Sequence, residues 1–237
     1  MNEPFHEPLT LWRFIRRYFV RIVIGSVLVV AVYGAIGVYA TYWREQRIAK
    51  GFEALDGRIG LEYAGPDWIP QSILDRATLF NRVMQLHLGS REITDAGLEH
   101  LNGLTKLEVL DISDTKVTDA GLEHLKGLTT LRHFYLDGTH VTDTGLEHLK
   151  GLTKLGSLTL GGTRVTDAGL KHLKGLTNLE FLDFSDTQVT DAGLENLKGL
   201  TNLAELFMFR TQVTEDGRAM LRKALPNCEI DPELTRN

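Results

Sequence analysis

Apolar residues recur along most of the chain with a constant spacing of 24 residues. Six of them keep this register, and Ile230 is the next term of the same series. The six are Leu86, Leu110, Phe134, Leu158, Leu182 and Leu206. The segment Thr-Asp-Ala-Gly-Leu at residues 94–98 returns with the same period, and a diverged copy begins at Thr214. A fixed period of this length predicts a repeat protein built from one small structural unit.

The unit at residues 104–127 shows which elements each repeat contains. Leu110 and Ile112 alternate with polar neighbours, which predicts a short strand. Thr118 is a typical N-cap residue, and Asp119 after it suits the first turn of a short helix. Gly127 is expected to end that helix in a left-handed conformation. We expect seven inward residues in this unit: Leu104, Leu107, Leu110, Ile112, Val117, Leu122 and Leu125.

One unit buries too little apolar surface to fold alone, so neighbouring units must stack. Stacked strands form a parallel sheet on one side, and the short helices line the other side. Because helices are bulkier than strands, we expect the sheet on the concave side and the helices on the convex side.

The repeat resembles the leucine-rich repeat family, in a bacterial subtype. The frame Leu107, Leu110 and Ile112 carries the resemblance, with Thr115 where the family has Asn or Cys. The resemblance covers about residues 80–230 and implies an α/β leucine-rich-repeat solenoid. It also implies a binding protein that contacts its partner with the concave strand face, which is an analogy at the level of the fold.

A second pattern precedes the repeats: residues 22–43 contain no charged side chain and carry aromatic residues at both ends. A helix of this length is long enough to cross a membrane. Four arginines before it place the N-terminus in the cytoplasm and the repeats outside, at the cell membrane. A cleaved signal peptide and a buried core helix are the alternatives.

These patterns divide the chain into five parts. They are a basic segment at 1–21, a transmembrane helix at 22–43, a helical linker and N-terminal cap at 44–82, repeats at 83–213, and a C-terminal cap at 214–237. A helix is expected over residues 72–83 and another over residues 219–225, followed by a short strand that ends at Ile230.

Charge and composition exclude several classes of function. The net charge is −5, and the residues after the first 43 carry −7, which argues against a nucleic-acid partner. The single cysteine, Cys228, excludes a disulfide framework and is interpreted as a small buried residue rather than a nucleophile. No nucleophile elbow, phosphate loop, zinc spacing or dinucleotide fingerprint is present, so we expect no enzyme activity and no cofactor.

The outward strand positions are the least repetitive part of the unit, and they carry the functional hypothesis. Aromatic side chains gather there and are typical interface anchors. Acidic side chains gather there as well and would attract a basic partner. Small residues at Ser157, Thr159, Gly161 and Gly162 predict a shallow floor between the two groups. The predicted contact residues are His87, Asp111, Asp114, His133, Tyr135, Asp137, Phe181, Asp183, Asp186, Glu205, Phe207, Phe209 and Arg210.

The sequence therefore predicts a membrane-anchored protein that binds another protein or peptide, with a basic one favoured by the acids. Neutral sequence drift at solvent-exposed strand positions would produce the same variation between units without any ligand. A structural envelope spacer without a discrete ligand and a carbohydrate-binding module are the alternative functions.

Three residue ladders are given structural interpretations. The histidines at 100, 124, 148 and 172 are interpreted as duplicated surface residues, not as a metal site. The aspartates that begin at Asp95 are interpreted as helix-start residues rather than calcium ligands. The threonines that begin at Thr115 are expected to bond a nearby backbone turn.

Overall fold

The computed structural model describes residues 58–63, 81–89 and 92–231. The predictions for residues 1–57, which include the transmembrane helix at 22–43, therefore lie outside the described residues. So does most of the helix expected over 72–83. No helix within the described ranges is both long and apolar enough to cross a membrane.

One sheet runs through the whole described region, with its strands in chain order from β1 to β8. β1 (Arg58–Tyr63) is antiparallel to β2, and every later pair is parallel. The other strands are β2 (Asn81–His87), β3 (Val109–Asp111), β4 (His133–Tyr135), β5 (Ser157–Thr159), β6 (Phe181–Asp183), β7 (Glu205–Phe207) and β8 (Glu229–Ile230).

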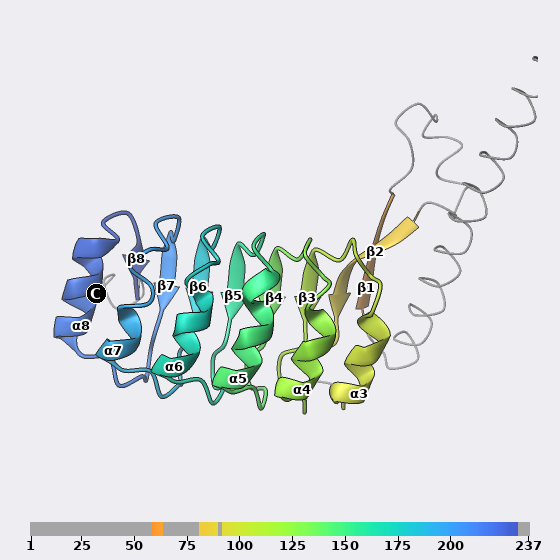
Figure 1. The fold of residues 1–237 in the computed structure, drawn as a ribbon, viewed down its shortest axis with the longest axis horizontal. Coiled ribbons are helices and arrows are strands. Elements are labelled where there is room, and N and C mark those ends of the chain that lie inside the picture. The colour runs from red at the N-terminus through yellow and green to blue at the C-terminus, as the bar shows by residue number, and fades with distance from the viewer. Residues whose placement is uncertain (1–57, 64–80, 90–91, 232–237) are drawn as a thin grey trace, which may run out of the picture.

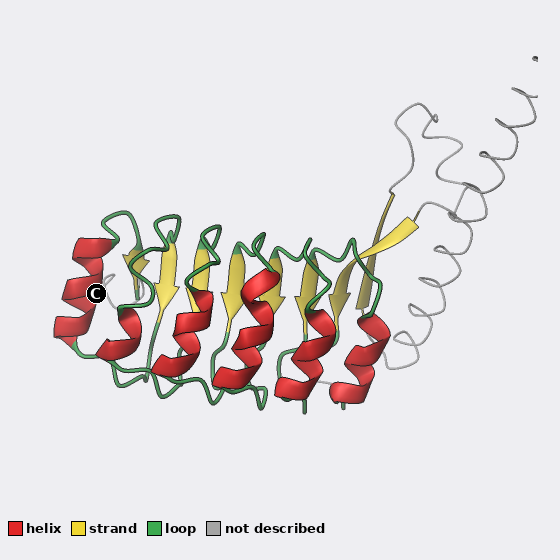
Figure 2. Cartoon of the chain, viewed as in Figure 1, coloured by secondary structure: helices red, strands yellow, loops and turns green. Residues whose placement is uncertain are grey.

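Short helices cover the side of the sheet opposite to its exposed face, one for each unit (Figure 1). The α-helices are α3 (Asp95–Leu98), α4 (Asp119–Leu122), α5 (Asp143–Leu146), α6 (Asp167–Leu170), α7 (Asp191–Leu194) and α8 (Glu215–Ala224). Short 3-10 helices extend four of them, at Glu99–Leu101, Glu123–Leu125, Glu147–Gly151 and Lys171–Leu173. Figure 2 shows helices and strands as two layers joined by loops at both edges. The predicted order of strand, turn, short helix and turn is confirmed.

The core is a stack of similar layers, made mostly of leucine, between the sheet and the helices. All seven residues predicted to point inward in the unit 104–127 are at most 1% exposed. Phe134 and Phe184 are the largest fully buried side chains and occupy strand-side positions of this core. Since each layer packs on the next, stability depends on the contacts between neighbouring units.

Three local expectations differ from the structure. The strand β1 was not predicted, and β2 already begins at Asn81, inside the range expected to be helical. Gly127 does not have a positive φ angle, because the helix passes into a tight turn without a left-handed residue. In the units from β3 to β7 the left-handed residue instead follows the strand, as at Asp114 and Gly138. Gly103, at the position of Gly127 in the preceding unit, does have a positive φ angle of 93°.

The Asp row has a further role that its position at the helix start did not reveal. Asp119 Oδ1 accepts a hydrogen bond from the backbone N–H of Thr142 at 2.7 Å, and Asp119 Oδ2 accepts one from its hydroxyl at 2.6 Å. The same pair of bonds joins Asp95, Asp143, Asp167 and Asp191 to the threonine of the next unit. We call this arrangement the Asp–Thr clamp.

The clamp also explains why each helix from α4 to α8 contains a glycine. A Cβ atom at Gly145 would collide with the Asp119 carboxylate of the preceding unit. The threonines that begin at Thr115 behave as predicted: the Thr115 hydroxyl donates to the Ile112 carbonyl at 2.7 Å, and Thr139 repeats this bond.

The C-terminal cap forms the predicted helix and short strand. α8 begins earlier than expected, at Glu215. Asp231 is 1% exposed, accepts a hydrogen bond from the Met208 N–H and pairs with Arg218 at 3.0 Å. This buried ion pair closes the end of the stack and was not predicted from the sequence.

Candidate functional site

The exposed surface of β2–β7, together with the turn after each strand, is named the strand face. All predicted contact residues lie on it, and none of them is buried. The parallel register aligns them in rows that cross the strands. One row contains Val109, His133, Ser157, Phe181 and Glu205, and the next contains Asp111, Tyr135, Thr159, Asp183 and Phe207.

At the positions that directly follow the strands, the backbone conformation limits which residues are tolerated. Asp114, Asp186 and Arg210 have φ angles of 54°, 57° and 51°, and glycines occupy the corresponding positions 138 and 162. Asp and Gly tolerate this left-handed conformation better than most residues, whereas Arg does not. The choice of Asp114 and Asp186 therefore has a structural reason besides any contact with a partner.

The carboxylates of the acidic residues in and just after the strands also accept hydrogen bonds from the backbone. Asp111 and Asp183 each accept a hydrogen bond from the N–H two residues later, at 3.0 and 2.7 Å. Asp137 accepts bonds from the Thr159 hydroxyl and from the Gly161 N–H. Burial raises the pKa of Asp137 above its usual value, and the nearby charge of Asp183 raises it further, while these two hydrogen bonds oppose the increase.

An aromatic group lies toward the C-terminal end of the strand face. The ring centroids of Phe181 and Phe207 are 5.3 Å apart, and those of Phe207 and Phe209 are 5.9 Å apart. The planes are tilted by 39° and 46°, within the geometries that aromatic pairs favour. All three rings remain partly exposed, so they present a continuous apolar surface.

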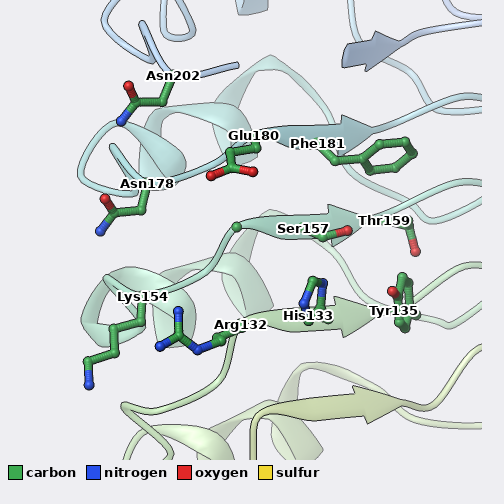
Figure 3. A pocket seen from close by; sticks show the side chains of 11 residues that line it. Arg132, His133, Tyr135, Lys154, Ser157, Thr159, Asn178, Glu180, Phe181 and Asn202 are labelled. Atoms are coloured by element: carbon green, nitrogen blue, oxygen red, sulfur yellow. The ribbon is translucent and has the colours of Figure 1, made fainter. Parts of the chain in front are cut away.

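A pocket of about 770 Å³ lies over β5. Ser157 and Thr159 of the predicted shallow floor line it, whereas Gly161 and Gly162 do not. Gly156, Ser157 and Thr159 form its floor. Figure 3 shows Tyr135 and Phe181 on opposite sides of Thr159, while Arg132 and Lys154 lie near the other end. We call this feature the β5 trench. Its lining residues are Arg132, His133, Tyr135, Lys154, Gly156, Ser157, Thr159, Asn178, Glu180, Phe181 and Asn202.

Sequence reasoning missed the part of the trench that lies before the strands. Arg132, Gly156 and Glu180 occupy one position of successive units, and Lys154, Asn178 and Asn202 occupy another. The first position varies as strongly as the strand positions do, which was an available signal. The asparagines are partly structural, since Asn178 donates to the Thr153 carbonyl at 2.7 Å.

The remaining candidates give no indication of chemistry. Burial raises the pKa of the Cys228 thiol to about 11, with contributions from Glu205 and Glu229, so the thiol stays protonated at neutral pH. Within the described ranges, no group of three or more His, Cys, Asp or Glu side chains is placed to hold a metal ion. In the histidine row, burial and the charges of Lys150 and Lys171 lower the pKa of His172.

Comparison with known families agrees with this architecture. Residues 81–141 match a family model described as "Leucine rich repeat", and residues 175–198 match one described as "Leucine Rich repeat". In these two ranges the repeats are therefore similar to leucine-rich repeats. A search of curated proteins finds no significant match.

Solved structures are similar to this chain at low sequence identity, and the first of them, with a TM-score above 0.5, shows the same fold. A leucine-rich-repeat protein of Leptospira interrogans is 21% identical with a TM-score of 0.52, over 63% of this chain and 37% of that one. Internalin C2 of Listeria monocytogenes is 23% identical with a TM-score of 0.49, over 65% of this chain and 75% of that one. The ectodomain of the Arabidopsis thaliana receptor kinase GASSHO1/SCHENGEN3, in complex with CASPARIAN STRIP INTEGRITY FACTOR 2, is 17% identical with a TM-score of 0.45, over 62% and 18%.

Proposed function

We propose that this leucine-rich-repeat protein binds another protein or peptide through its strand face. Leucine-rich repeats generally mediate protein–protein interaction. The observation that carries the proposal for this chain is the β5 trench with its aromatic borders, because it lies where neighbouring units differ most. Exposed aromatic side chains beside a hollow are the usual anchors of an interface.

The charge of the strand face favours a basic partner. Asp111, Asp114, Asp183 and Asp186 lie at or just after the C-terminal ends of their strands, where the described residues oppose them with Arg210. Arg210 pairs with Asp186 at 3.2 Å in an exposed position. This pair neutralises only part of the negative charge of the four aspartates. Such a field accelerates association with a positively charged partner and falls with added salt.

We propose further that residues 22–43 anchor the chain in the cell membrane, with the N-terminus in the cytoplasm and the repeats outside. The support is the uncharged, aromatic-flanked sequence and the arginines before it. Protease treatment of intact cells tests the orientation: the repeats should be cleaved from outside. Resistance in intact cells with cleavage after lysis would overturn it.

The binding proposal is tested with a double variant. Tyr135→Ala removes one border of the trench, and Phe207→Ala removes the middle ring of the aromatic group beyond the other border, Phe181. Neither Tyr135 nor Phe207 is buried in the core. We expect capture of a partner by the full chain from membranes to fall about tenfold or more. Lys126→Ala with Lys150→Ala is the matched control on the helix side, where each lysine makes an exposed pair within its own unit. Unchanged affinity of the Tyr135/Phe207 variant for an identified partner would contradict the assignment.

A further inference from the structure

We infer that the β5 trench is the anchor subsite for one large apolar side chain of an extended peptide, with a basic residue two positions away. This inference rests on the proposed function and names the chemistry of the partner. Three features of the trench support it: its width, its aromatic borders and the charges at its two ends.

The width fits one inserted side chain. β4 and β6 lie on either side of β5, so their axes are about 9.6 Å apart at the usual strand spacing. Tyr135 and Phe181 border this gap, and the side chain of Thr159 between them is smaller than either ring and forms part of the pocket floor. Two van der Waals separations of about 3.5–4.0 Å leave room for a single ring or branched chain between the two borders.

Two residues of the floor, Gly156 and Thr159, permit close approach of an apolar side chain. A Cβ atom at Gly156 would meet only the backbone oxygens of Arg132 and Asn178, each at 3.8 Å. The Thr159 hydroxyl is already satisfied because it donates to Asp137. An apolar side chain that covers Thr159 therefore does not leave this hydroxyl unpaired, which would otherwise cost binding free energy.

The charges at the two ends give the peptide a direction. Arg132, Lys154 and Glu180 lie at the end before the strands, and Arg132 also pairs with Glu108 at 3.6 Å (Figure 3). The charges at this end therefore offset one another and do not favour a basic residue. Asp183 lies toward the other end, and its Oδ1 accepts the Ser185 N–H. Among the described residues, no hydrogen-bond donor or cation pairs with Asp183 Oδ2, which is available to a cation from the partner.

The spacing between anchor and basic residue follows from strand geometry. Phe181 and Asp183 are two residues apart on one face of β6, a rise of about 6.6 Å. In an extended peptide the side chains at positions i and i+2 also face the same side with the same rise. A peptide that lies along β5 therefore reaches the trench with one side chain and Asp183 with the side chain two positions before or after it.

The experiment measures binding of synthetic nine-residue peptides to the full chain by fluorescence anisotropy. The central residue is Trp, Leu or Ala, and Lys, Gln or Glu stands two positions before or after it in a Gly/Ser background. We expect Trp and Leu to bind about tenfold or more tightly than Ala, and Lys more tightly than Glu. Equal binding of Ala-centred peptides, or no binding of any peptide, would overturn the inference.

Two variants assign the effect to the trench. Ser157→Phe fills the floor, and the chain already carries Phe at the same position of the next unit, Phe181, so the fold accepts it. Val109→Phe makes the same kind of change in the same row but outside the trench. We expect Ser157→Phe to weaken the Trp peptide about tenfold and Val109→Phe to leave it unchanged. Equal effects of the two variants would overturn the inference.

Asp183→Asn is the third variant and keeps an acceptor for the Ser185 N–H. It should abolish the preference for Lys over Gln while leaving the preference for Trp over Ala. A persistent Lys preference would overturn the assigned role of Asp183. If a glycan array, rather than the peptides, gives binding that Ser157→Phe abolishes, the trench takes carbohydrate and the peptide assignment is wrong. If Tyr135→Ala with Phe207→Ala weakens a natural partner but Ser157→Phe does not, the proposed function stands and the anchor inference fails.

Discussion

The two sides of this solenoid have different relations between sequence and structure. On the helix side, neighbouring units are nearly identical, and each repeats the Asp–Thr clamp with almost the same distances. On the strand face, the backbone repeats just as closely, but the side chains change from His to Ser to Phe across one row. Core packing and the Asp–Thr clamp therefore determine which residues occur on the helix side. The strand face carries residues that the fold itself does not require.

The sharpest test of this difference compares two neighbouring residues of β4. Phe134 is fully buried in the leucine core, and Tyr135 beside it points to the strand face. We expect Phe134→Ala to lower the free energy of unfolding by about 3–5 kcal/mol, because it leaves a large cavity. Tyr135→Ala should lower it by about 1 kcal/mol or less, since its ring is already partly solvated.

Urea denaturation of both variants measures these free energies. The comparison between the two sides would fail if Tyr135→Ala destabilised the protein as much as Phe134→Ala, because the ring would then be part of the core.

A smaller effect is expected from two aspartates on opposite sides. Asp119→Ala removes both acceptors of an Asp–Thr clamp and leaves the Thr142 N–H without a partner. Such a loss costs about 1–3 kcal/mol. Asp186→Asn removes the same charge on the strand face, where the exposed pair with Arg210 contributes about 1 kcal/mol at most.

Thermal unfolding of the two variants gives the difference, with about 0.5 kcal/mol or less expected for Asp186→Asn because Asn tolerates a positive φ. Equal destabilisation by the two variants would show that the clamp has no special structural role.

The repeating part of the fold could be predicted from the sequence because the same 24-residue pattern occurs six times in succession. The buried positions of the unit 104–127, such as Leu110 and Val117, follow directly from periodicity. The Asp–Thr clamp could not, because Asp119 bonds to a threonine 23 residues away, and its local position suggested only a helix start. β1 was missed for a related reason: it lies outside the repeat and pairs antiparallel to β2.

The candidate site was predicted in outline and missed in part. The exposed rows were correct because strand residues alternate between the two faces. Arg132 and Glu180 were missed because they precede the strands, where no alternation indicates which side they face. The left-handed turn at Asp114 was missed because a single Asp does not reveal its φ angle, whereas a glycine after a helix, such as Gly127, is the usual signal for a left-handed residue.

The smallest expected effect concerns Arg210, which holds a left-handed backbone at a position where other units have Gly or Asp. For an L-residue this conformation costs about 1–2 kcal/mol. In Arg210→Gly that cost disappears, but the greater freedom of unfolded glycine offsets about 0.5–1 kcal/mol of the gain. The lost exposed pair with Asp186 offsets about 0.2 kcal/mol more. We expect a net stabilisation of about 0.5 kcal/mol, measured by urea denaturation.

Gln188→Gly is the matched control, because Gln188 is exposed and does not have a positive φ. Glycine should destabilise the protein there by about 0.5–1 kcal/mol, since only the unfolded-state term remains. Opposite signs at the two positions would show that Arg210 is kept despite its backbone, as expected for a side chain selected on the strand face. A loss of stability in Arg210→Gly equal to that in Gln188→Gly would mean that the turn imposes no strain, and the argument for selection at Arg210 would fail.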